Sequence, residues 1–483
     1  MSNSRCSFYF LCSKFTIIIT NICLKILCFF VILVIQILVF LIFVKASFLA
    51  VQGGVCMGSA DTNRLYMCID LKCFYASVEC ADLGLDPFTT PLVVADGSRG
   101  KGAITLAISP ALKKLGVKNR SRLFQIPPHI EYLTVKPHMK RYMQVSAEIY
   151  GTLLKYVAPE DVHVYSIDEY FIDITPYLPL YKKTPRQLAQ MLLDAVLEAT
   201  KIYATVGIGT NLFLAKIALD ILAKHAPDFI GYLDESLFKE KIWYHQPLTD
   251  IWQIGKGIAN RLHKYGAYDL HGITMIPEAK LYKEFGINAE LIIDHAWGRE
   301  PCTIADIHAY RPIKHSISHS QILLRNYTYE EAYVPMREMV ESLVLELLQI
   351  KGVTNHIHVH IGYADEMVRS TGGSKKLKQY TDSLQTLTAS VIKLYEQHCR
   401  KNELIRRIGI SFEDLVNRSA IPQEVDLFST LTTNAEEKER QVQEAMLSIK
   451  EQFGKNSILR ASSLQEEGTM RFRNTLVGGH NGE

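Results

Sequence analysis

Two apolar runs with the composition of β-strands contain acidic side chains, and this feature constrains the fold more than any other. Residues 66–71 carry Asp70 and lead into a helix-compatible segment. Residues 162–175 place Asp168 and Glu169 among strong β-formers, where ionised groups are costly unless a cation compensates them. Because adjacent strand residues point to opposite faces, Asp168 and Glu169 can face one point only at a turn or bulge. The pattern therefore predicts a β-hairpin with a metal site at its bend.

Three carboxylates from two strands form an all-oxygen ligand set of the kind that suits Mg²⁺. This ion takes few protein carboxylates and completes its coordination with water and substrate phosphate. Two such ions would span the attacking and leaving oxygens of a nucleotidyl transfer. The alternative for Asp168 and Glu169 alone is an edge strand with solvated carboxylates. Their combination with Asp70 favours the metal site.

The first 56 residues differ in composition from everything after them. Residues 26–44 are apolar apart from Gln36 and are long enough to cross a bilayer as a helix. Two interpretations stay open. The segment is either a single-span membrane anchor, or it is translated upstream DNA and the protein starts at Met57 or Met67.

Length, composition and cysteine usage bound the class of protein. A chain of 483 residues with 48% hydrophobic content is too long for one core and too apolar for a disordered chain, so several domains are expected. A net charge of +3 does not by itself indicate a nucleic-acid partner. Ten cysteines occur, none of them in a CxxC pair, which supports neither a disulfide framework nor a zinc site.

Three motifs in order carry a resemblance to a known family. The segments IDLKCFYASVE, SIDEYFIDIT and GIGTNLFLAKIALD together are similar to the Y-family translesion DNA polymerases, especially UmuC-like and DinB-like members. Each motif alone would be weak, but the ordered trio is highly specific. The resemblance covers residues 66–416, and it implies an α+β fold of the right-hand polymerase type.

The family order of parts implies a division of the chain. We expect a hydrophobic N-terminal segment (1–56), a palm (57–90 and 128–225), small fingers (91–127), a thumb with a helix-hairpin-helix (226–304), an α+β little finger (305–420) and a C-terminal tail (421–483).

The resemblance implies a catalytic centre with two Mg²⁺ ions. Asp70, Asp168 and Glu169 would be the catalytic metal ligands, and the backbone carbonyl of Leu71 would assist them.

The resemblance also implies how the nucleotide is bound. Tyr75 would exclude ribonucleotides by crowding the sugar 2′-position, with Phe74 packed beside it, although composition alone allows Tyr75 to be an ordinary core aromatic. Lys216 would project toward the triphosphate. In the expected fingers, Pro110 and Lys113 stand where the family commonly has Tyr and Arg, and a lysine lacks the bidentate fork of arginine.

The stretch around Lys113 is strongly basic. No acidic residue interrupts seven basic side chains between residues 98 and 123, which suits a surface that faces polyphosphate, although such runs are often solvated faces. The seven are Arg99, Lys101, Lys113, Lys114, Lys118, Arg120 and Arg122.

Residues 248–266 resemble a helix-hairpin-helix DNA-binding element. Gly255 and Gly257 would let backbone N–H groups approach a phosphate at a helix N-terminus, with Lys256 between them. The alternative is a plain helical turn.

In the expected little finger, residues 357–361 and 406–412 alternate as strands do. Lys375, Lys376 and Lys378 follow a Gly-Gly pair that we interpret as a turn, which would place positive charge beside a template backbone. Three histidines at alternating positions are interpreted as plain strand histidines, because no carboxylate or cysteine converges on them. They are His356, His358 and His360.

Residues 421–428 resemble a sliding-clamp binding peptide. Leu427 and Phe428 would enter a hydrophobic pocket while Gln423 hydrogen-bonds, although one residue more separates them than in the commonest short form. The alternative is a hydrophobic latch onto the little finger.

The implied function is template-directed DNA synthesis across damaged DNA. The implied partners are primed template DNA, dNTPs, a sliding clamp and accessory proteins of the SOS type. The implied location is the cytoplasm, with a membrane involved only if the N-terminal segment is a real part of the protein. Two other functions fit part of the chain, namely a membrane-anchored nucleotidyl cyclase and a noncatalytic DNA-binding remnant.

Overall fold

The computed structural model describes residues 64–97, 100–312, 315–421 and 430–481. The apolar segment 26–44 and the predicted clamp-binding residues Gln423, Leu427 and Phe428 lie outside these ranges. Within them, no helix combines the length and the apolar character needed to span a membrane.

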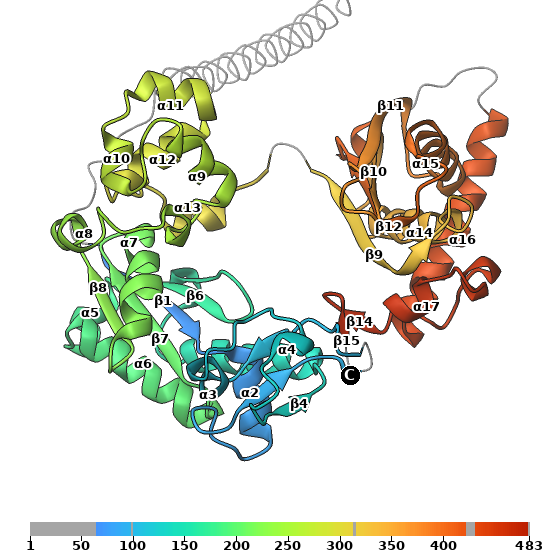
Figure 1. Ribbon diagram of the computed structural model, residues 1–483. Helices are drawn as coiled ribbons and strands as arrows, with labels where there is room; N and C mark the ends of the chain where they lie inside the picture. The colour runs from blue at the N-terminus through green and yellow to red at the C-terminus, as the bar shows by residue number, and fades with distance from the viewer. Residues whose placement is uncertain (1–63, 98–99, 313–314, 422–429, 482–483) are drawn as a thin grey trace, which may run out of the picture. The chain divides into compact units, whose positions relative to one another are not determined.

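A five-stranded sheet in the order β5-β6-β1-β7-β8 forms the first lobe (Figure 1). Only β7 and β8 run parallel to each other. The central strand β1 is almost fully buried, as its apolar composition requires. The strands are β1 (Tyr66–Leu71), β5 (Val162–Val164), β6 (Glu169–Asp173), β7 (Ala204–Gly209) and β8 (Ile230–Leu233).

Helices cover both faces of this sheet, and the alternation of β1 decides which. Met67 and Ile69 face the side packed by α2 (Phe74–Asp82), α4 (Met139–Leu153) and α6 (Pro185–Thr200). Cys68 faces the other side, which is packed by α7 (Leu212–Ile217). Because residues two apart in a strand share a face, Asp70 lies on the α7 side.

The apolar spacing of residues 212–225 predicts a helix after β7, and this helix is present, but it changes its winding along the way. The side chain of Asn211 caps α7 by accepting from the amide of Leu214 at 2.8 Å. The helix continues as a π-helical turn, Ala218–Leu222, and a 3-10 turn, Ala223–His225.

The glycines of β7 serve helix packing rather than phosphate binding. A Cβ atom on Gly207 would lie 2.1 Å from the backbone oxygen of Ala215, and one on Gly209 would lie 2.2 Å from the amide nitrogen of Ala215. Only glycine allows α7 to lie this close to the strand.

A small three-stranded sheet, β3-β2-β4, forms with α3 a separate apolar core. Its elements are β2 (Leu92–Val94), β3 (Ala107–Ile108), α3 (Pro110–Lys114) and β4 (Leu133–Val135). Pro110 occupies the first turn of α3, where its missing N–H costs nothing, and Ser109 caps the helix. Because β4 pairs with β2, this sheet extends beyond residue 127, where we expected the fingers to end.

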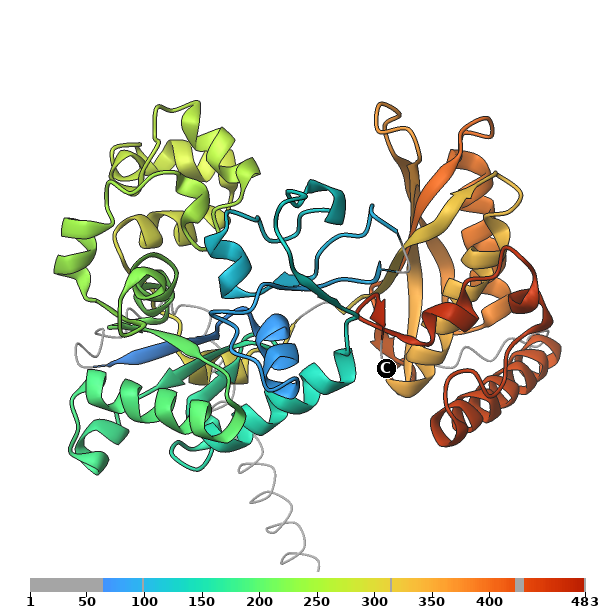
Figure 2. The ribbon, with the colours of Figure 1, turned by 60° about the horizontal axis from the view of Figure 1, so that its bottom comes forward.

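Residues 234–312 are helical, as Figure 2 shows in green and yellow. The helices are α8 (Glu235–Lys241), α9 (Lys256–His263), α10 (Leu270–Thr274), α11 (Glu278–Phe285), α12 (Asn288–Ala296) and α13 (Ile304–Ala309). The helix expected before the Gly-x-Gly segment is only a 3-10 turn, Leu248–Asp250, and Gly255 is the N-cap of α9.

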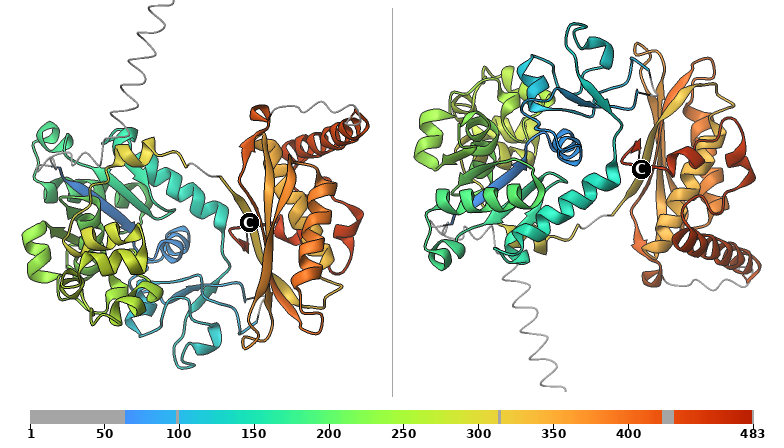
Figure 3. Two further views of the ribbon diagram at one scale, coloured as in Figure 1. Left: turned by 90° about the horizontal axis from the view of Figure 1, so that it is seen from above. Right: turned by 90° about the horizontal axis from the view of Figure 1, so that it is seen from below.

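The C-terminal lobe is a four-stranded antiparallel sheet in the order β11-β10-β12-β9. Both long helices of the lobe lie on one side of this sheet, as the two views in Figure 3 show. Residues of β10 alternate between buried and half-buried, so the face of the sheet opposite these helices is open. The elements are β9 (Ile317–Tyr327), α14 (Tyr333–Gln349), β10 (Gly352–Tyr363), β11 (Thr371–Thr381), α15 (Leu384–His398) and β12 (Ile405–Glu413).

Our interpretation of the Gly-Gly pair as a turn is wrong. Gly372 and Gly373 lie inside β11, paired with β10. A Cβ atom on Gly373 would lie 2.3 Å from Nε2 of His398, so the glycine lets the end of α15 approach the strand.

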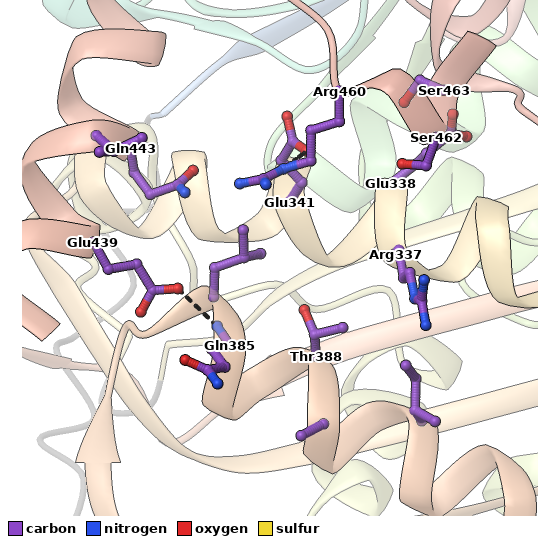
Figure 4. A pocket seen from close by; sticks show the side chains of 14 residues that line it. Arg337, Glu338, Glu341, Gln385, Thr388, Glu439, Gln443, Arg460, Ser462 and Ser463 are labelled. Carbon is purple, nitrogen blue, oxygen red and sulfur yellow. Dashed lines mark hydrogen bonds and ion pairs between the residues drawn. The ribbon is translucent and has the colours of Figure 1, made fainter. Parts of the chain in front are cut away.

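The tail packs on the helical side of this lobe through α16 (Thr430–Phe453) and α17 (Met470–Arg473). Glu338 accepts hydrogen bonds from the backbone amides of Thr469 and Met470, and Glu341 is paired with Arg460 at 2.7 Å. A cleft of about 660 Å³ lies beside these contacts (Figure 4). Tail and lobe therefore share buried charged contacts.

Candidate active site

Asp70 and Glu169 lie directly opposite each other on the neighbouring antiparallel strands β1 and β6. Directly opposite residues of an antiparallel pair share a face of the sheet, so both carboxylates lie on the α7 side. Like charges in such positions repel each other. The arrangement therefore needs positive charge beside it.

Asp168 lies in the turn between β5 and β6, as the hairpin prediction required. The amides of Tyr165 and Ser166 both donate to the carbonyl of Glu169, at 3.0 and 3.1 Å, which closes the turn. The Ser166 hydroxyl donates to Oδ1 of Asp168 at 2.6 Å. The turn also places Asp168 beside the end of β1, because the amide of Leu71 donates to the carbonyl of Asp168 at 2.9 Å.

Two lysines contact the carboxylates. Lys216 Nζ lies 2.7 Å from Glu169 Oε1, and only 8% of the Lys216 side chain is exposed. Lys224 Nζ lies 3.4 Å from Asp70 Oδ2, and its side chain is 41% exposed. The predicted Lys216 is thus buried against a carboxylate, while Lys224, which our sequence analysis did not single out, has the more accessible ammonium group.

Burial and neighbouring charges alter the protonation of this cluster. Burial raises the pKa of Asp70 to about 6; Lys224 opposes this rise, and the charges of Asp168 and Glu169 add to it. Burial alone would lower the pKa of Lys216, but the acidic groups around it raise that pKa above its ordinary value. The excess of negative charge thus outweighs desolvation at Lys216.

The donor set fits a divalent cation, although the described side chains do not enclose one. Among the described residues, no three His, Cys, Asp or Glu side chains are grouped as a metal site, and the lysines contact the carboxylates instead. The contacts that the described residues make with the Glu169 carboxylate, from Cys68 at 3.1 Å and from Lys216, both use Oε1. Oε2 therefore remains for a hard cation, together with the carboxylates of Asp70 and Asp168.

The predicted gate residue Tyr75 lies beside this cluster on a rigid aromatic support. Its ring stacks on Tyr142 at 4.6 Å between centroids, and Phe74 lies 5.6 Å away. The Tyr142 hydroxyl donates to the buried Glu79. Burial and the charge of Asp168 both raise the pKa of Tyr75, which is consistent with its place next to the acidic cluster. Sequence reasoning missed Tyr142, because only the fold brings α4 against α2.

Lys113 and Lys114 lie exposed in the last turn of α3. Lys114 Nζ lies 5.6 Å from the ring centroid of Phe88, and Lys72 Nζ lies 3.8 Å from that of Phe229. Burial lowers the pKa of Lys72, and the nearby Lys113 lowers it further. Since Lys72 lies two residues from Asp70, this basic group borders the carboxylates.

The predicted DNA-binding residues lie on two separate lobes. Gly255, Lys256 and Gly257 are exposed at the N-terminus of α9, with open space beside both glycines. Lys376 is opposite His356 and therefore lies on the open face of the C-terminal sheet. Lys375 is opposite the buried Ile357, which places it on the helix-covered face.

Sequence comparisons place the chain among known proteins. Residues 69–220 match the profile of the impB/mucB/samB family, and residues 314–427 match that family's C-terminal domain. The chain is 32% identical over 420 residues to the "Putative UV-damage repair protein UvrX" of Bacillus subtilis strain 168, covering 86% of this chain and 97% of that protein. It is 28% identical over 426 residues to "DNA polymerase IV 2" of the same strain, covering 86% of this chain and 99% of the relative.

A solved structure shows the same fold. The "Y-family DNA polymerase chimera Dbh-Dpo4(243-245)-Dbh" matches with a TM-score of 0.57 and 22% identity. The match covers 73% of this chain and 99% of the chimera.

Proposed function

Because the chain belongs to the impB/mucB/samB family of Y-family translesion DNA polymerases, we propose that it extends a primer on damaged template DNA with dNTPs as substrates. The observation that carries this proposal is the convergence of Asp70, Asp168 and Glu169 at the adjoining ends of β1 and β6. A nucleotidyl cyclase and a noncatalytic remnant have no support among the relatives.

The three carboxylates would hold two Mg²⁺ ions. When bound, these ions would lower the pKa of the primer 3′-hydroxyl and neutralise the departing pyrophosphate. Asp70 and Glu169 would supply oxygen ligands from two neighbouring strands on one face of the sheet, and the hydrogen bond that the Ser166 hydroxyl donates would orient Asp168. The Leu71 carbonyl would complete the protein ligands.

Tyr75 would select the sugar and the basic groups would hold the triphosphate. The stack on Tyr142 keeps the Tyr75 ring from moving aside, so a 2′-hydroxyl would meet a fixed surface. We assign the triphosphate to Lys224 in addition to Lys216, because Lys224 is exposed and lies beside Asp70. Lys113 would add charge from α3, as a point charge without a bidentate fork.

The sheet lobe and α7 would form the palm, and the small sheet with α3 the fingers. The helical lobe would form the thumb and the C-terminal sheet the little finger. The N-terminus of α9 would bind a backbone phosphate through its free amides. The open face of the C-terminal sheet would bind a second stretch of backbone through Lys376 and Lys378.

A sliding clamp and damage-response accessory proteins would be the protein partners. The clamp assignment rests on sequence alone, through Gln423, Leu427 and Phe428. Loss of clamp-stimulated synthesis in Leu427→Ala with Phe428→Ala would support it, and unaltered stimulation would refute it.

Incubation of the full chain with primed template, Mg²⁺ and dNTPs tests the proposed function. The template carries one blocking lesion, and an undamaged template serves as the control. We expect primer extension on both templates. A cyclic nucleotide product, or DNA binding without extension, would refute the proposal.

A further inference from the structure

Asp220 joins the two lysines of the site, and the reaction as described assigns it no role. Its Oδ2 lies 3.0 Å from Lys216 Nζ, and its Oδ1 lies 2.7 Å from Lys224 Nζ. Each lysine also contacts one candidate metal ligand, Glu169 or Asp70. Charges therefore alternate without a break from Glu169 through Lys216, Asp220 and Lys224 to Asp70, and we call this run the lysine bridge.

The winding of the helix places the lysine bridge over the sheet. Lys216, Asp220 and Lys224 follow one another at intervals of four residues, the spacing at which helix side chains meet. In a regular α-helix such positions drift around the axis, because four residues exceed the 3.6 of one turn. The π-helical turn Ala218–Leu222 has a wider winding and offsets this drift at Asp220. Asp220 therefore remains in contact with both Lys216 and Lys224.

A cation that binds Glu169 or Asp70 would take that carboxylate away from its lysine partner. Lys216 and Glu169 are both about nine-tenths buried, so neither finds bulk water when its partner is taken away. A buried charge without a partner is costly. A cation that takes Glu169 therefore leaves the buried Lys216 ammonium group in need of another carboxylate within reach, and Asp220 already contacts Lys216 as well as Lys224.

We propose that Asp220 is a positioning residue for divalent metal binding. Before cations bind, Asp220 holds Lys216 and Lys224 beside the metal carboxylates. Once cations occupy those carboxylates, Asp220 keeps both lysines paired. The inference rests on the proposed function, because it takes Asp70 and Glu169 to be metal ligands. It makes Asp220 necessary for tight cation binding without making it a ligand.

Titration of the full chain with Mn²⁺ in the absence of nucleotide, followed by the electron paramagnetic resonance signal of free Mn²⁺, tests this inference. We expect Asp220→Asn to weaken Mn²⁺ binding about tenfold, since one partly buried charge contact is lost at each lysine. Asp220→Glu should restore most of the affinity. Glu235→Gln, the same charge change at an exposed position of α8, should leave it unaltered.

Lys216→Met gives a second test, in which the Mn²⁺ affinity is expected to rise rather than fall. It removes the competitor for Glu169, so Mn²⁺ should bind more tightly than in the wild type. Equal Mn²⁺ affinity in Asp220→Asn and wild type, or failure of Asp220→Glu to restore it, would overturn the inference.

These results remain distinguishable from failure of the proposed function. If Glu169→Ala abolishes Mn²⁺ binding while Asp220→Asn leaves it unaltered, only the proposed role of Asp220 is refuted. If the wild type binds no Mn²⁺, or if Glu169→Ala binds it normally, the metal assignment itself falls.

Discussion

Single residues around Tyr75 determine how the sugar of the incoming nucleotide would be read. The ring is fixed by its stack on Tyr142, which is itself anchored to the buried Glu79. In the proposed role, a 2′-hydroxyl would therefore be rejected by steric contact with this supported ring rather than by a lost hydrogen bond.

We predict that Tyr75→Ala raises ribonucleotide insertion relative to deoxyribonucleotide insertion by about one to two orders of magnitude, because steric exclusion of a small group is worth roughly 1–3 kcal/mol. Single-nucleotide insertion kinetics with each sugar would measure the ratio. Tyr165→Ala, which removes an exposed tyrosine from the β5–β6 turn, serves as the control. Unchanged sugar selectivity in Tyr75→Ala would remove the gate assignment.

The raised pKa of Asp70 predicts how stability depends on pH when metal is absent. An acid whose pKa rises from 3.8 to about 6 on folding binds its proton more tightly in the folded chain. Stability therefore falls as the pH rises from about 4 to about 6, and the loss is complete above that range.

In EDTA, the free energy of unfolding of the wild type should fall relative to that of Asp70→Asn by on the order of 1–3 kcal/mol across this pH window. Denaturant unfolding at several pH values would measure the difference. A difference that does not vary with pH would contradict the assigned protonation.

The proposed DNA contacts would be made by individual elements, and strand β11 offers the clearest case. Lys376 and Lys378 lie on the open face of the sheet, whereas Lys375 faces the helices. Alternation along one strand therefore separates residues that can reach a DNA backbone from one that cannot.

We predict that Lys376→Ala with Lys378→Ala weakens DNA binding and lowers the slope of log affinity against log salt by about 2, since each phosphate contact contributes about 0.9 on duplex DNA. Fluorescence anisotropy over a salt series would measure the slope. Lys375→Ala is the matched control and should leave it unchanged. Equal effects of both variants would show that the open face is not the DNA surface.

The tail contributes to the stability of the C-terminal lobe. Glu341 is almost fully buried and depends on Arg460, which comes from the tail. We predict that Arg460→Ala destabilises the protein by about 1–3 kcal/mol, because it leaves a buried carboxylate without its donor. Arg337 is exposed on α14, the helix that carries Glu341, and Arg337→Ala should change stability by less than about 0.5 kcal/mol. Thermal unfolding would compare the two, and equal effects would contradict this account of the tail.

For the molecule as a whole, sequence periodicity predicted the parts that depend on local pattern. The strand with Asp70, the hairpin with Asp168 and Glu169, and the capped helix after β7 all follow from spacing that is visible in the chain. Contacts between segments that are far apart in the chain could not be predicted from the sequence. Tyr142 supports Tyr75 only because α4 folds against α2.

The missed features of the site have physical causes of the same kind. Asp220 and Lys224 join the site through a π-helical turn, which no periodicity reveals. The sequence predicts a turn at Gly372 and Gly373 instead of a strand. The strand could not be predicted, because the approach of His398 to it is a tertiary contact. Glycine alone does not tell a turn from a close approach.

The proposed polymerase activity depends on three carboxylates from β1 and the β5–β6 hairpin, which would hold the metal ions. Primer extension by the wild type beside Asp168→Ala and Glu169→Ala tests it most directly. We predict that each variant binds primed DNA normally but extends it about a thousandfold more slowly or not at all, since each carboxylate's contribution through the ions is worth several kcal/mol. Extension at the wild-type rate by either variant would contradict the claim.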